Sequence, residues 1–194
     1  MSITKSCWKI SIVFGFALTG ANFHVAVADT VVPRTIEYGY EVTTDANSKA
    51  CRIILLLSDS SFPESVKFQF WIGRQRLQGR ALDTAGFTID VIDLKFANGQ
   101  PIGSQAVDLS SANFVSPTFS SAGRFHMTTL GDGGLSAATS DLQSANAFFN
   151  ALVVGTYEVS FARKGLSTIR THKVNKAPSP DIVQQFTECL RTLS

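Results

Sequence analysis

The sequence predicts a mainly β domain with two helices, either an antiparallel β-sandwich or a curled sheet. Segments that alternate apolar and polar residues fill the first two thirds of the chain, which is typical of half-buried strands. Two segments near the end have helical apolar spacing behind N-cap signals. Two cysteines, Cys51 and Cys189, are placed so that a disulfide would tie the C-terminal helix to the sheet.

Residues 1–28 have the features of a secretory signal peptide. Two lysines precede an apolar run, Ile10–Leu18, and the segment ends in Ala26-Val27-Ala28. The apolar run is shorter than the roughly 20 residues that span a bilayer. We therefore expect cleavage after Ala28, a single β-rich domain over residues 29–194, and a periplasmic or secreted location without a membrane span in the mature chain. The alternative is a retained anchoring helix.

The composition excludes several classes of protein. Of the 194 residues, 44% are hydrophobic and 16% charged, which argues against a disordered chain. Loss of residues 1–28 removes two lysines and no acid, which leaves 15 basic and 15 acidic side chains. A neutral mature chain lacks the basic field that nucleic-acid binding requires, so no nucleic-acid partner is expected.

The early strands are predicted from their apolar patterns. Thr35–Thr44 is a strand that ends in turn residues, and Cys51–Leu57 is a continuous apolar run, typical of a strand covered on both faces. Val66–Gly73 alternates strictly between apolar and other residues, which places Trp71 on the outer face.

The next segments contain a change of phase and a turn. The apolar positions shift by one residue at Val91-Ile92, which predicts a β-bulge. Asn98-Gly99 is a strong hairpin signal, with a return strand expected over 102–109. Ser and Gly are dense over 110–140, which we interpret as loops flanking one strand at 124–130.

The last third predicts two helices around a hairpin. Ser140-Asp141-Leu142-Gln143 matches a capping box, and Gly155 would close the helix. A hairpin is expected from Thr156 to Val174. Ser179-Pro180 begins the final helix, whose apolar stripe contains Cys189.

The cysteines predict a disulfide and no metal site. An even pair in a small exported domain usually forms a bridge, and Cys51 and Cys189 allow one connection once Cys7 leaves with the leader. Two buried free thiols are the alternative. No histidine or further cysteine lies at ligand spacing from either residue, so no metal is expected.

Catalytic patterns are weak. A G-x-S-x-G elbow is absent, and a hydrolase would have to use His172 or His126. Asp90 and Asp93 point to opposite faces of a regular strand and come closer only if the bulge exists. The glycines of 131–134 lack the lysine or helix start that a phosphate or dinucleotide loop needs, so no cofactor is expected.

The best binding candidate is the surface around Trp71, Arg74 and Arg76. Tryptophan and arginine are enriched in protein interfaces, and the three residues lie close together in the sequence. A solvated strand end with edge-protecting charges is the alternative. Arg170 and His172 also share a face of their strand and form a second, weaker candidate.

The C-terminal half resembles the invasion-associated locus B family of exported bacterial proteins. The likeness rests on Phe148-Phe149-Asn150-Ala151-Leu152, Gly155, Tyr157-Glu158-Val159-Ser160-Phe161 and the closing helix. That family's usual cysteine pair before the helix is absent here, and Cys189 has no counterpart in it. The resemblance implies a β-sandwich and a non-enzymatic envelope or secreted role, without catalytic residues to carry over.

These observations predict an exported, non-enzymatic binding protein of the bacterial envelope or secreted fraction, with a protein partner and a role in cell or host interaction. One alternative is a periplasmic inhibitor or immunity protein that blocks an exported enzyme. The other is a secreted hydrolase that uses His172 or His126.

Overall fold

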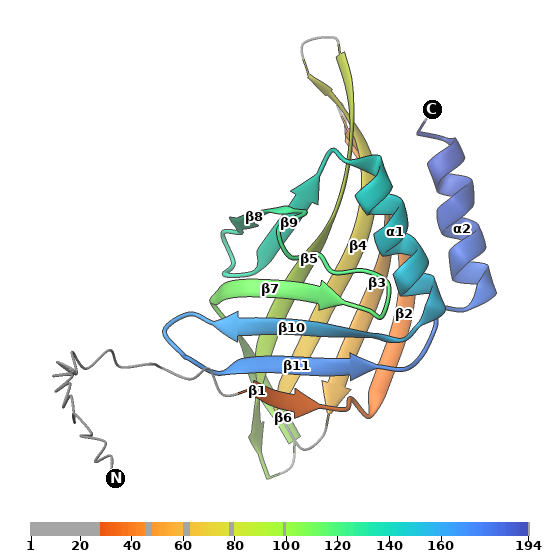
Figure 1. Ribbon diagram of the computed structural model, residues 1–194. Coiled ribbons are helices and arrows are strands. Elements are labelled where there is room, and N and C mark those ends of the chain that lie inside the picture. Colours follow the sequence, from red (N-terminus) through yellow and green to blue (C-terminus); the bar gives the residue numbers. More distant parts are fainter. Residues whose placement is uncertain (1–27, 46–47, 60–62, 78–79, 99, 194) are drawn as a thin grey trace, which may run out of the picture.

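Two β-sheets face each other across one apolar core (Figure 1). The structure is a computed structural model that describes residues 28–45, 48–59, 63–77, 80–98 and 100–193. Apart from Ala28, the leader predicted from the sequence lies outside the described residues. No helix in the described part of the chain is long and apolar enough to cross a membrane.

The larger sheet is antiparallel throughout. Its path runs β2-β3-β4-β5-β9-β8, and β6 pairs with β5 beyond the end of β9. The strands are β2 (Thr35–Thr44), β3 (Ser48–Asp59), β4 (Glu64–Leu77), β5 (Arg80–Ala97), β6 (Gln100–Ala106), β8 (His126–Thr129) and β9 (Leu135–Thr139). Strands β4 and β5 extend past their neighbours as a two-stranded ribbon, seen at the top of Figure 1.

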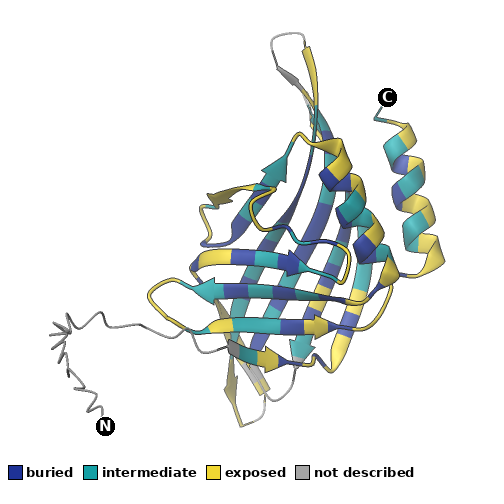
Figure 2. Ribbon diagram, in the orientation of Figure 1, coloured by how far each residue is buried: buried dark blue, intermediate teal, exposed yellow. Residues whose placement is uncertain are grey.

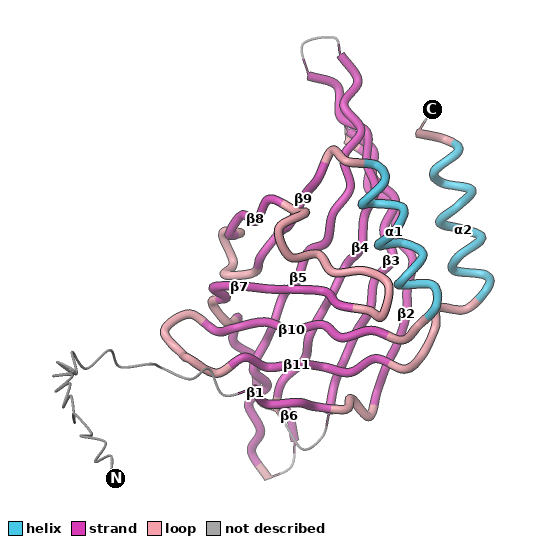
Figure 3. The backbone as a smooth tube through the Cα atoms, in the orientation of Figure 1, coloured by secondary structure: helices cyan, strands magenta, loops and turns pink. Residues whose placement is uncertain are grey.

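The smaller sheet lies across the strands of the larger one (Figure 1). Its order is β1-β11-β10-β7, and β1 pairs parallel to β11 while the other pairs are antiparallel. The strands are β1 (Ala28–Val31), β7 (Leu109–Val115), β10 (Tyr157–Arg163) and β11 (Ile169–Val174). Helices α1 (Leu142–Val154) and α2 (Pro180–Arg191) stand beside this sheet, as Figure 3 shows.

The core is rich in phenylalanine. Phe148 of α1 contacts the rings of Phe68 and Phe87 from the larger sheet and Phe114 from the smaller sheet. Buried residues alternate with less buried ones along several strands in Figure 2, as expected of strands with one face in the core. One continuous cluster therefore joins both sheets and both helices.

The predicted fold class is confirmed: the chain is mainly β with two helices, and a disulfide joins Cys51 of β3 to Cys189 of α2. The helix ends agree with the sequence signals. Asp141 caps α1, one residue after the first residue of the predicted box, and Gly155 closes α1 at φ 77°. Ser179 caps α2.

Three local predictions were wrong. The pairing of β4 with β5 continues through Val91 and Ile92 without a bulge, and the irregularity lies between Lys95 and Phe96, opposite β6. The apolar residues change phase at Val91-Ile92 because the inner face of β5 becomes polar at Asp93.

The other two errors concern β3 and the strands β7 and β9. Strand β3 is buried on one face only, since Leu56 on its other face is 40% exposed. Strands β7 and β9 both fall where the sequence suggested loops, because their inward residues are too few to give a clear period; these are Leu109, Ala112 and Phe114 in β7 and Leu135 and Ala137 in β9.

Candidate functional site

The outer face of the larger sheet, turned away from the smaller sheet, contains a hollow of about 490 Å³. Its floor comes from alternate residues of β3, β4, β5 and β9, and the turn before β9 forms one side. We call this hollow the Trp71 groove. Its lining is Ser48, Lys49, Ala50, Arg52, Gln69, Trp71, Gly73, Arg74, Gln75, Thr84, Thr88, Asp90, Leu130, Asp132 and Ser136.

Trp71 is the large side chain of the groove, and small residues surround it. The strand register places Gly86 directly opposite Trp71, with Ala138 next along the same row. Gly73 and Ala50 are opposite each other in the adjacent row. The small side chains leave the indole partly exposed above a low floor. The sequence prediction that Trp71 lies on the outer face is confirmed.

A chain of polar side chains crosses the floor of the groove. The Arg52 Nη1 donates to Gln69 Oε1 at 3.2 Å, and Gln69 Nε2 lies 3.5 Å from Asp90 Oδ2. Gln69 is only 4% exposed. Arg52 Nε and Asp90 Oδ1 are buried and have no hydrogen-bond partner among the described residues. Burial, and then repulsion from Asp132, raise the pKa of Asp90.

Arg74 is part of the groove but its charge is already paired. Its Nε and Nη2 donate to the two carboxylate oxygens of Asp83, directly opposite on β5, at 2.6 and 2.8 Å. Arg74 therefore brings no unbalanced charge to this surface. Arg76 lies farther along the ribbon, where its backbone pairs with Ala81. Of the three predicted residues, the structure brings Trp71 and Arg74 into one hollow.

The two histidines of the hydrolase alternative lie on different sheets. His126 of β8 is exposed, in the same cross-strand row as Trp71 and Gly86. His172 of β11 is 4% exposed and stacks on Phe161. In the described residues, neither histidine has a hydrogen bond to a serine, threonine or cysteine.

His172 belongs to a buried ionic cluster that the sequence did not reveal. Its Nε2 lies 3.2 Å from Glu64 Oε1, and Glu64 also accepts from Arg163 Nη2 at 2.5 Å. Arg163 binds Asp93 as well, and Arg170 approaches Glu64 at 3.8 Å. Glu64 and Asp93 come from the larger sheet and the other three from the smaller one, so the cluster joins the sheets at one end.

This cluster favours the ionised form of Glu64. Burial alone would raise the pKa of Glu64, but hydrogen bonds from His172 and Arg163, with the nearby charge of Arg170, lower it overall. The chain separations run from 70 residues, between Asp93 and Arg163, to 108, between Glu64 and His172, so no local pattern could predict the contacts. Asp90 and Asp93 point to opposite faces, one in the groove and one in this cluster.

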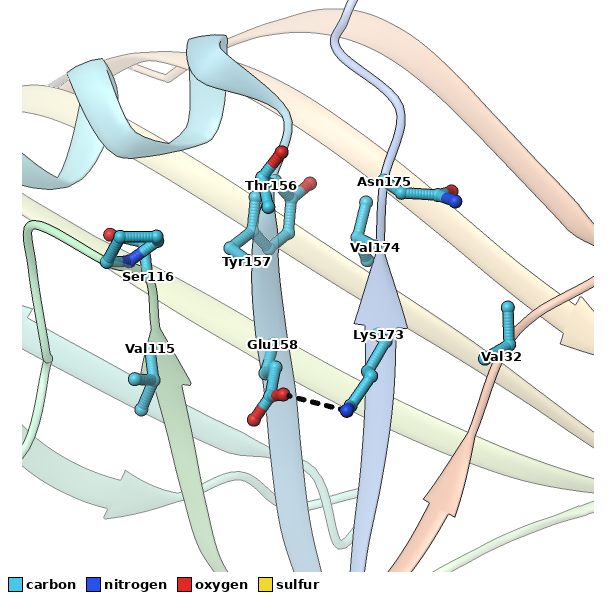
Figure 4. A pocket seen from close by; sticks show the side chains of 10 residues that line it. Val32, Val115, Ser116, Thr156, Tyr157, Glu158, Lys173, Val174 and Asn175 are labelled. Atoms are coloured by element: carbon cyan, nitrogen blue, oxygen red, sulfur yellow. Dashed lines mark ion pairs between the residues drawn. The ribbon is translucent and has the colours of Figure 1, made fainter.

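A second hollow, of about 510 Å³, lies where β7 and β11 end and β10 begins (Figure 4). Figure 4 shows Val115 and Val32 on either side of the ion pair between Glu158 and Lys173, whose atoms are 3.7 Å apart. The charged groups pair with each other, and the rest of the lining is mostly apolar. This hollow offers fewer directional contacts than the Trp71 groove.

Within the described residues, no group of three or more histidine, cysteine, aspartate or glutamate side chains is placed to hold a metal ion. Comparisons with protein-family models, curated proteins and solved structures give no match. The resemblance to the invasion-associated locus B family therefore stays a prediction.

Proposed function

We propose that the protein is an exported, non-enzymatic binding protein and that it contacts its partner through the Trp71 groove. The observation that supports this most is the partly exposed indole of Trp71 beside polar groups that the protein itself leaves incompletely bonded. A concave site with an aromatic surface and a few convergent polar groups is the usual form of a ligand site.

The buried ionic cluster supports a structural role for His172. Its contacts are with Glu64 and the Phe161 ring, and Arg163 closes the cluster toward the larger sheet. A general base needs a reacting group within hydrogen-bond reach. The hydrogen-bond partner of the His172 ring is the Glu64 carboxylate, which is not a nucleophile that His172 could activate. The export of the chain and the protein nature of the partner come from the sequence and remain part of the proposal.

The test is a crosslinked pull-down with the oxidised protein from periplasmic, envelope and culture-medium fractions, read by mass spectrometry. Trp71→Ala is compared with Phe96→Ala, a matched aromatic substitution at a site that is 50% exposed and outside the groove. We expect Trp71→Ala to lose the partner and Phe96→Ala to keep it. A partner that both variants retain equally would contradict the site.

One stoichiometric enzyme captured through Trp71 would turn the proposal toward the inhibitor alternative. Envelope components captured in the same way would favour the binding role that the family resemblance implies. Both variants must first show the far-ultraviolet spectrum and the intact disulfide of the parent protein, so that a lost partner reports on the groove.

A further inference from the structure

The lining of the Trp71 groove has an unusual mixture of side chains for a protein surface. One indole ring lies among four hydroxyl groups, those of Ser48, Thr84, Thr88 and Ser136. Gln69, Asp90 and Arg52 add planar amide, carboxylate and guanidinium groups. The groove therefore offers a single apolar surface surrounded by many donors and acceptors. A ligand that fits it needs one apolar face and a rim of hydroxyl groups.

The charges of the groove are balanced. Lys49, Arg52 and Arg74 are matched by Asp90, Asp132 and the Asp83 that pairs with Arg74. The Lys49 Nζ is also engaged, since it donates to Thr192 of the C-terminal turn. A nucleotide, with its phosphates, would need an excess of positive charge. Balanced charges favour a neutral ligand.

The polar groups on the floor have bonding capacity to spare. Arg52 has five N–H donors, and among the described residues its side chain makes one hydrogen bond, from Nη1 to Gln69. In the same part of the chain the Asp90 carboxylate has one side-chain hydrogen bond, from Gln69 at 3.5 Å, which is long for such a bond. Buried polar groups usually have partners. Hydroxyl groups can donate to the carboxylate and accept from the guanidinium, so they suit this floor.

The surrounding backbone argues against an added peptide strand. Strands β3, β4 and β9 are paired on both sides along the floor of the groove, and β5 is paired with both β4 and β9 over residues 85–89, so most backbone groups of the floor are already bonded. Strand addition requires a free edge. The ligand must instead bind through the side chains of the sheet face.

Building on the proposed function, we propose that the Trp71 groove binds a neutral saccharide carried by that partner, with the apolar face of one sugar ring stacked on the indole of Trp71 and its hydroxyl groups bonded to the floor. The volume of about 490 Å³ lies within the range of small-ligand sites, which is about 300–1,000 Å³. This accommodates a sugar ring and a linked neighbour.

The test uses tryptophan fluorescence of the full chain with Trp8→Phe, which leaves Trp71 as the sole tryptophan. The probes are glucose, galactose, mannose, N-acetylglucosamine, cellobiose and chitobiose, with glucuronate and glucosamine as charged comparators. We expect a saturable change in Trp71 emission with at least one neutral sugar, and weaker binding of its charged comparators. Calorimetry gives the affinity for variants that lack the indole.

Two variants in the same chain assign the contact. Trp71→Ala is expected to weaken binding about tenfold or more, because it removes the stacking surface. Thr88→Val keeps the shape of the side chain and the strand propensity but removes a hydroxyl, and is expected to weaken binding severalfold. Phe96→Ala should bind as the parent does.

Several results would overturn the inference. These are the absence of a saturable change with any neutral sugar at millimolar concentration, equal binding by Trp71→Ala, or tighter binding of the charged comparators. If Trp71→Ala loses a pulled-down partner and no sugar binds or competes with that partner, the proposed binding role stands and the saccharide fails. A protein partner is then the occupant. If Trp71→Ala changes neither measurement, both proposals fail.

Discussion

Trp71 of β4 lies directly opposite Gly86 of β5, and its indole fills the space above that glycine. A Cβ atom at position 86 would be 2.8 Å from Cζ2 of Trp71 and would also collide with the carbonyl oxygen of Ala137. The indole can occupy this position only because residue 86 is a glycine. The proposed binding surface is formed by this pair as much as by the tryptophan alone.

Gly86→Ala should disturb both stability and the groove. Because the methyl group meets backbone on one side and the indole on the other, we expect a loss of about 1–3 kcal/mol in the free energy of unfolding. The emission of Trp71 should also shift as the ring moves. Denaturant unfolding and fluorescence measure these effects.

Gly39→Ala is the matched control for that substitution. Gly39 lies in β2 of the same sheet, and an added Cβ there would be 3.9 Å from the nearest atom, Ile54 Cβ. The control should change stability by less than about 1 kcal/mol. Equal losses in the two variants would mean that the contact between Gly86 and Trp71 has no special role.

The disulfide should account for much of the stability of α2. It joins residues 138 positions apart in the sequence, and the chain-entropy model gives roughly 4–5 kcal/mol as an upper figure for so long a loop. Reductant should therefore lower the urea midpoint of the parent, with earlier proteolysis in α2. The variant with Cys51→Ala and Cys189→Ala should not respond to reductant, and a parent midpoint unchanged by reductant would contradict the prediction.

Glu64 should make stability depend on acid pH. Its pKa is lower in the folded protein than the ordinary 4.5, because the hydrogen bonds of His172 and Arg163 outweigh burial. The stabilising contribution is therefore complete above about pH 4.5 and is lost as the pH falls through the lower, folded pKa. Urea unfolding of the parent across this acid range measures the loss.

Glu64→Gln should remove that acid dependence. It removes the buried counter-charge that Arg163 and Arg170 share, while Arg163 keeps Asp93 and Arg170 keeps Asp29, so we expect a loss of about 1–3 kcal/mol at neutral pH. Glu158→Gln, which breaks the exposed pair with Lys173, should cost less than about 1 kcal/mol. Parallel pH profiles for the parent and Glu64→Gln would show that another group is responsible.

Local chemistry made much of the fold predictable. The cap at Ser179, the closing Gly155 and the hairpin at Asn98 depend on neighbouring residues, and the structure has each where the sequence placed it. The disulfide was predictable because Cys51 and Cys189 each fell on an apolar face. These signals need no knowledge of which strands pair.

The ionic cluster and the groove floor could not be predicted in this way. Val91 ends the apolar inner face because Glu64 and Asp93 meet Arg163 from the other sheet, and the sequence alone made the change of phase look like a bulge. The pairing of Arg74 with Asp83 likewise requires the register of β4 and β5. Side-chain partners across strands depend on register, which the local pattern did not supply.

The central claim is that the partner covers Trp71, and acrylamide quenching tests this most directly. In the full chain with Trp8→Phe, the emission comes from Trp71, whose indole is partly exposed. We expect the captured partner, once bound, to reduce quenching of that emission strongly. Unchanged quenching with the partner demonstrably bound would place the contact elsewhere on the molecule and contradict the account.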